Sequence, residues 1–128
     1  MHYLLDTVTI IRLFSESGKI GKQAKEIFKN QNQDVHYFIS IVSLMEILVL
    51  SEKHRIPVNL SDVLDKIEKS SRYSVVELTT DIIKTTQTLK FYELHDRLIL
   101  STALWLGIPV ISSDMRFKEV KEIKVIWD

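Results

Sequence analysis

The chain alternates between short apolar runs and longer segments in which apolar residues have helical spacing. The short runs are rich in strand-forming residues and cover residues 3–5, 35–39, 75–78, 108–111 and 125–127. The helical spacing covers residues 8–14, 18–30, 40–54, 61–67, 79–89 and 93–106. Near-continuous apolar strands that alternate with helices are typical of parallel sheets covered on both faces. We therefore predict an α/β fold, a three-layer α/β/α sandwich around a mainly parallel sheet.

Nothing in the composition divides the chain into parts. It has 128 residues, of which 45% are hydrophobic and 27% charged, and we find no repeat, low-complexity tract or linker. These values are those of an ordinary globular domain. We predict a single domain over residues 1–128.

The composition also excludes several functions. Because there is no cysteine, disulfides, thiolate metal sites and cysteine nucleophiles are ruled out. The 17 basic residues balance the 17 acidic ones, so any nucleic-acid binding must come from a local patch. The start lacks a signal-peptide pattern, and the uncharged, largely apolar stretch at residues 98–111 is too short to cross a bilayer. We expect a cytoplasmic protein with no membrane partner.

Two aspartates follow strand-like runs. Asp6 ends the run at residues 3–5, and Asp114 comes shortly after the run at residues 108–111. In open parallel sheets, ligands bind at the carboxyl ends of the strands, near the point where the strand order reverses. For each aspartate alone, the N-cap of the next helix is an equally good explanation.

Glu46 is the single charge in an apolar helical segment, residues 41–50. Burying one carboxylate costs several kcal/mol unless the group is paired, protonated or bound to metal. The alternatives to a metal are a buried salt bridge to an arginine, or an exposed glutamate on a narrow polar strip with Ser43.

Asp96 lies in the first turn of a predicted helix, where the helix dipole also favours an acid. Asp96 and Asp114 flank one helix–Gly–strand unit, so both can lie at the same end of the sheet. Carboxylates that converge from separate segments repel one another, and a hard divalent cation is the usual reason to assemble them. Oxygen ligands select Mg²⁺ or Mn²⁺, which activate water for phosphodiester hydrolysis. The candidate catalytic and metal-binding residues are therefore Asp6, Glu46, Asp96 and Asp114.

These acids stand in blocks that resemble the PIN-domain nucleases, in particular the VapC-like toxins of bacterial and archaeal toxin–antitoxin pairs. The blocks cover residues 4–7, 40–47, 96–103 and 107–117, in order along essentially the whole chain. The resemblance implies a ribonuclease that uses one or two Mg²⁺ or Mn²⁺ ions and leaves 5′-phosphates. It also implies a homodimer and a small antitoxin partner that blocks the pocket.

Further side chains match the family around its acids. Thr7 and Ser112 stand at flanking hydroxyl positions that help orient ligands or water, and the family more often has Thr where Ser112 stands. Arg116, close to Asp114, is the best candidate for contacting a phosphate of the RNA substrate.

Other residues receive simpler explanations. The lysines at helical spacing are interpreted as a solvated face; they are Lys19, Lys22, Lys25 and Lys29. Residues 18–21 have the GxxG spacing of KH loops, but without a KH context they are predicted to lead into a helix. His95 is interpreted as an exposed histidine without a role, and Trp105 and Trp127 are predicted to lie in the core.

Competing families lack their own key residues here. A haloacid-dehalogenase-type phosphatase needs an aspartate where Val8 stands, and a receiver domain needs paired early acids and a phosphorylatable Asp after a middle strand. No GxGxxG or GxxxxGK[ST] motif is present. The strongest rival is a non-catalytic PIN-like module that binds RNA or protein. A missing acid would indicate such a module, and none of the four is missing.

Overall fold

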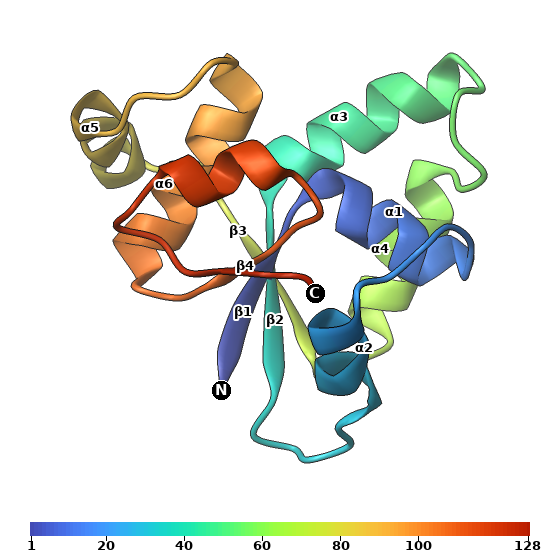
Figure 1. Ribbon diagram of the computed structural model, residues 1–128. Coiled ribbons are helices and arrows are strands. Elements are labelled where there is room, and N and C mark those ends of the chain that lie inside the picture. Colours follow the sequence, from blue (N-terminus) through green and yellow to red (C-terminus); the bar gives the residue numbers. More distant parts are fainter.

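The computed structural model describes every residue, 1–128, and contains one sheet of five strands. The strands are β1 (His2–Leu5), β2 (His36–Ser40), β3 (Tyr73–Val76), β4 (Val110–Ile111) and β5 (Val125–Ile126). All neighbouring strands are parallel, in the order β3-β2-β1-β4-β5. Together with the helices around the sheet, this confirms the predicted α/β fold (Figure 1).

Six α-helices and one 3₁₀ helix connect the strands. They are α1 (Thr7–Ser15), α2 (Lys22–Lys29), α3 (Ile41–Glu52), α4 (Leu60–Glu68), α5 (Thr80–Thr88), α6 (Leu94–Leu106) and the 3₁₀ helix η1 (Met115–Glu119). Side-chain caps set several of the starts; for example, the Ser40 hydroxyl accepts from the Val42 amide at 3.0 Å. Gly107 ends α6 in the left-handed conformation, with φ of 70°. None of these helices combines the length and apolar character that a bilayer crossing requires.

Strand β3 begins and ends two residues earlier than the sequence indicated. Tyr73 pairs in register with Tyr37 of β2, and their rings stack with centroids 5.6 Å apart. Glu77 and Leu78, which were expected in the strand, are exposed and lead into α5. Aromatic stacking and strand pairing therefore outweigh the apolar character of Leu78 in setting the end of this strand.

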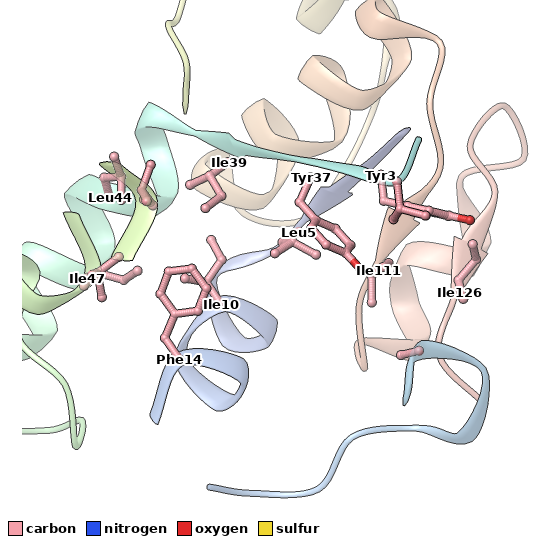
Figure 2. Packing of buried hydrophobic residues seen from close by; sticks show 14 of the residues in the cluster. Tyr3, Leu5, Ile10, Phe14, Tyr37, Ile39, Leu44, Ile47, Ile111 and Ile126 are labelled. Atoms are coloured by element: carbon pink, nitrogen blue, oxygen red, sulfur yellow. The ribbon is translucent and has the colours of Figure 1, made fainter. Parts of the chain in front are cut away.

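Apolar side chains leave the sheet alternately on its two faces, and helices cover both. Leu5 packs with Ile10 and Phe14 of α1 in one cluster, to which α2, α3 and α4 also contribute (Figure 2). Leu4, its neighbour in β1, belongs to a second cluster on the other face, which α6 dominates. This alternation produces the three layers.

The two tryptophans differ in burial. Trp127, just after β5, is buried as predicted, and its carbonyl accepts from the Ala24 amide of α2 at 3.1 Å. Trp105 was predicted to lie in the core, but it is 46% exposed. Residues 98–103 of α6 are all buried, and Trp105 lies beyond them near the end of the helix.

The strand order determines where a site can form. From β1 the chain fills one side of the sheet with β2 and β3, and then crosses to β4 and β5 on the other side. The switch point therefore lies between the carboxyl ends of β1 and β4, which Asp6 and Ser112 follow directly. In the upper part of Figure 1, α3 and α5 extend past this end of the sheet.

Candidate active site

Asp6 connects the end of β1 to the start of α1. Its Oδ1 accepts from the Thr9 amide at 2.9 Å and so caps α1, while its Oδ2 accepts from the Ser112 hydroxyl at 2.5 Å. Asp6 is 6% exposed, and burial raises the pKa of its carboxyl group. The N-cap explanation is thus correct for one oxygen, whereas the other faces the end of β4.

Ser112 joins the ends of the two central strands. Besides donating to Asp6, its hydroxyl oxygen accepts from the backbone amide of Asp114 at 3.0 Å. A serine hydroxyl has a single proton, and here that proton is used on Asp6. Ser112 therefore orients a carboxylate and fixes the backbone that carries Asp114.

Glu46 lies at the edge of the site on α3. The Thr7 hydroxyl donates to Glu46 Oε1 at 2.6 Å, and the Ser43 hydroxyl lies 3.0 Å from the Thr7 oxygen. Glu46 makes no ion pair with an arginine, and Ser43 is fully buried rather than part of an exposed polar strip. Both alternative explanations for Glu46 are therefore wrong in this structure.

The premise that α3 buries its whole surface is also wrong. Met45, Leu48 and Val49 are 51%, 40% and 46% exposed, so α3 is apolar all round but buried on one face only. The Glu46 side chain is 24% exposed, between the buried face and this outer apolar face. Its carboxylate consequently keeps contact with water and with incoming ligands.

Two residues that the sequence analysis did not select lie beside Glu46. His95 Nδ1 is 3.6 Å from Glu46 Oε2 and 3.5 Å from Glu93 Oε1. Potential ligand atoms of these three residues all lie within 4.8 Å of one another, an arrangement that could hold a metal ion. The available signal was the position of Glu93 and His95 at the start of the same helix as Asp96.

Asp96 shows that the predicted acids converge. It lies in the first turn of α6, whose N-cap is Glu93. Burial, followed by the charges of neighbouring carboxylates, raises the pKa of Asp96 to about 6. Those neighbours are Glu93, Glu46, Asp114 and Asp6. The other three predicted acids are thus close enough for their charges to act on Asp96, whereas the closely spaced potential ligand atoms belong to Glu46, Glu93 and His95. The catalytic and metal-binding roles of the four acids stay predictions.

Arg116 contacts the acids themselves in this structure. Its Nη2 lies 2.8 Å from Asp114 Oδ2, its Nε donates to Asp114 Oδ1 at 3.2 Å, and Nη2 is 3.9 Å from Asp96 Oδ2. Hydrogen bonding from Arg116 lowers the pKa of Asp114. The residue predicted to contact phosphate therefore partly neutralises the acidic cluster. The lysines of the proposed solvated face are exposed and pair with none of these acids.

The donor set fits a hard divalent cation. The carboxylates offer oxygen ligands and carry more negative charge than the half-exposed Arg116 can balance. The hydroxyls of Thr7 and Ser112 already donate to carboxylates, so they orient the acids. Asp6, Glu46, Asp96 and Asp114 are the residues that would hold the ion.

Metal binding is expected to depend on pH through Asp96. Its pKa of about 6 in the fold exceeds the ordinary value of 3.8, so the folded state binds this proton more tightly. Without metal, the free energy of unfolding should therefore fall as the pH rises from about 4 to about 6. Because Mn²⁺ must displace the same proton, we expect Mn²⁺ to raise the Tm by about 3 °C more at about pH 7.5 than at about pH 5.

Thermal unfolding with and without Mn²⁺ at both pH values measures this difference. In Asp96→Asn the pH-dependent part of the Mn²⁺ effect should become smaller, because this titrating group is gone while Asp6, whose pKa is also raised, remains. An equal Tm increase at both pH values in the wild type would contradict the prediction. No increase at millimolar Mn²⁺ would indicate that these acids are structural.

Arg116 is expected to compete with the metal for Asp114. Replacing Arg116 with methionine keeps the aliphatic stem and removes the guanidinium, so we expect Mn²⁺ affinity to rise about two- to fivefold. Isothermal titration with Mn²⁺ measures the change. Lys118→Met is the matched control, because it removes an exposed cation of the same 3₁₀ helix that makes no ion pair. Equal gains in Mn²⁺ affinity in both variants would mean a general charge effect. Weaker Mn²⁺ binding in Arg116→Met would contradict competition between Arg116 and the metal for Asp114.

Fold and site together define the class: an open parallel α/β protein with an acidic site at the switch point of its sheet. The sequence model of the PIN domain matches residues 3–123. The chain belongs to the PIN domain family. Among curated protein sequences, none matches the chain significantly.

Solved structures of toxin–antitoxin proteins have the same fold. The chain is similar to VapBC2 from Rickettsia felis bound to a promoter DNA fragment, with a TM-score of 0.78, 17% identity and full coverage of both chains. It is also similar to DNA-bound VapBC from Salmonella typhimurium, with a TM-score of 0.71, 21% identity and coverage of 98% of this chain and 97% of the other. A third is the sarcin–ricin loop cleaving toxin VapC20 from Mycobacterium tuberculosis, with a TM-score of 0.67, 16% identity and coverage of 95% and 98%.

Proposed function

We propose that the chain is a Mg²⁺- or Mn²⁺-dependent endoribonuclease and the toxin of a cytoplasmic toxin–antitoxin pair. The observation that carries the proposal is the convergence of the four acids at one end of the sheet. Arg116 contacts both Asp96 and Asp114. Ser112 links Asp114 to Asp6, and Thr7, next to Asp6, donates to Glu46. Such a cluster is costly without a cation, and a divalent cation held there would activate water for phosphodiester hydrolysis. Membership of the PIN family supports the same reading.

The metal and the residues of the site have different proposed roles. When bound, the metal supplies a Lewis acid that activates water and neutralises phosphate oxygens. Thr7 and Ser112 hold the carboxylates of Glu46 and Asp6 in place through bonds of 2.6 and 2.5 Å. Arg116, whose guanidinium lies beside Asp114 and Asp96, would bind a phosphate of the strand.

The choice of RNA and the antitoxin partner rest on similarity. A solved relative cleaves the sarcin–ricin loop, and others are complexes of toxin with antitoxin. The outer face of α3 offers independent support for a protein partner. Met45, Leu48 and Val49 form an exposed apolar surface directly beside Glu46, where a bound antitoxin would also block the acids. The homodimer is proposed from the family resemblance.

Cleavage of a labelled circular RNA tests the function. With Mn²⁺ or Mg²⁺ the wild-type chain should convert the circle to a linear product, because an endonuclease needs no end, and EDTA should stop the reaction. A matched single-stranded DNA circle should be cut more slowly. Cleavage that persists in EDTA, or no cleavage of any RNA with Mn²⁺, would favour the alternative of a non-catalytic PIN-like module that binds RNA or protein.

A further inference from the structure

Tyr92 is an exposed aromatic residue whose ring is held in place. The residue is 66% exposed, yet its ring packs edge-on against Phe91 with centroids 5.0 Å apart. Phe91 in turn packs against the buried Phe117 at 5.3 Å, and the Tyr92 hydroxyl donates to Glu119 Oε1 at 2.7 Å. The ring is therefore preorganised on the surface and continuous with the core beneath it.

The loop that carries Tyr92 is also fastened. Arg97 of α6 donates through Nε to the Leu89 carbonyl at 2.7 Å and through Nη2 to the Thr86 carbonyl at 2.8 Å. These bonds tie the end of α5 and the start of the loop to the helix that bears Asp96. The position of Tyr92 relative to the acids is thus determined by the fold.

One guanidinium group separates Tyr92 from the candidate active site. The Arg116 guanidinium carbon lies 5.5 Å from the centre of the Tyr92 ring and 5.7 Å from that of Phe91, within cation–π range. The same guanidinium binds Asp114 at 2.8 Å. A nucleotide strand whose phosphate lies at the acids would therefore pass next to Tyr92.

A pocket of about 560 Å³ opens beside this ring. Its apolar lining consists of Leu89, Phe91, Tyr92 and Val120, and its polar lining consists of Thr88, Lys90, Glu119 and Glu122. Such a volume exceeds the minimum for a small-molecule site and accepts a base with its ribose. Two carboxylates against one lysine give the lining a net negative charge, which disfavours phosphate, so the group that suits the pocket is a base rather than the backbone.

We propose that this pocket binds the base of a nucleotide next to the scissile phosphate, with Tyr92 as the stacking residue and Glu119 as a specificity determinant. The inference rests on the proposed ribonuclease function and extends it to substrate choice. A carboxylate accepts from the amino groups of guanine, cytosine and adenine. In uracil the one N–H lies between two carbonyl acceptors, which repel a carboxylate. The pocket thus favours a base with an amino group.

Steady-state cleavage of a short RNA, with the position of cleavage mapped on the wild type, tests Tyr92. In Mn²⁺, Tyr92→Ala should lower kcat/KM about tenfold, mainly by raising KM, since stacking on an aromatic residue contributes to the binding of each base. Tyr92→Phe should stay within about threefold of the wild type, since the ring remains. Trp105→Ala, which removes an exposed aromatic at the opposite end of α6 from Asp96, should have no effect.

Metal affinity and base preference separate this role from a structural one. Mn²⁺ titration should give the same affinity for the wild type and Tyr92→Ala. On RNAs that differ only at the flanking base, Glu119→Gln should reduce the preference for amino-bearing bases over uracil. A Tyr92→Ala variant with unchanged KM, or an equal loss in Trp105→Ala, would overturn the inference while leaving the ribonuclease function intact. If the wild type cuts no RNA in Mn²⁺, both the ribonuclease function and the base-binding role of the pocket are contradicted.

Discussion

Replacing Asp6 with asparagine should lower Mn²⁺-dependent RNA cleavage by about 100-fold or more, which corresponds to roughly 3 kcal/mol of transition-state stabilisation. Asp6 is the most buried of the four acids and lies at the switch point of the sheet. Asparagine keeps the oxygen that caps α1 through the Thr9 amide, so the fold should survive. The negative charge that faces the site is lost, and with it much of the metal affinity.

Cleavage rates and Mn²⁺ titration on the purified variant measure both effects, and its Tm reports the fold. Asp65→Asn serves as the control, because Asp65 is an exposed acid of α4 that pairs only with Lys69 at 2.9 Å. We expect this control to cleave at the wild-type rate. An Asp6→Asn variant that folds and cleaves like the wild type would refute the assignment of Asp6.

Replacing Gly21 with alanine should destabilise the fold by about 2–4 kcal/mol and lower the Tm by about 10 °C. Gly21 is the buried N-cap of α2, and an added Cβ would lie 2.3 Å from the Trp127 carbonyl oxygen and 2.5 Å from its carbon. Both are backbone atoms, so no side-chain rotation relieves the contact. The carbonyl also accepts from Ala24, and this bond between α2 and the end of the chain would be lost.

Gly107→Ala separates the steric effect from the conformational effect of losing a glycine. Gly107 has a φ of 70°, but a Cβ there meets no atom within 4 Å, so this variant carries only the left-handed backbone penalty of about 1 kcal/mol. Thermal or urea unfolding of the two variants measures the difference. Equal losses would show that close packing against Trp127 is not the reason for glycine at position 21.

The meeting of Asp6 with the end of β4 followed from the sequence because parallel strands share a carboxyl edge. The apolar runs before Asp6 and Asp114 indicated such strands, and the structure brings the two acids together through Ser112. Helical periodicity likewise placed Asp96 in a first turn. These are local patterns whose geometric consequence does not depend on the rest of the chain.

By contrast, the sequence could not predict which residues surround each of the candidate site residues. The apolar sequence around Glu46 indicated burial, but which face of α3 is covered depends on the helices that pack against it. The contact of Arg116 with Asp114 rather than solvent depends on the turn of η1 and the rings of the α5–α6 loop. Glu93 and His95 become candidate metal ligands only because the fold places Glu46 beside them, and Glu46 lies far away in the sequence.

The bond from Ser112 to Asp6 spans 106 positions of the chain, and this has a consequence for synthesis. A growing polypeptide presents Asp6 first, whereas Ser112 follows 106 positions later and Asp114 comes after it. Strands β1 and β4 cannot pair before then, so the acids stay dispersed on the nascent chain. The four acids of the proposed site can therefore come together only after residue 114 has been synthesised.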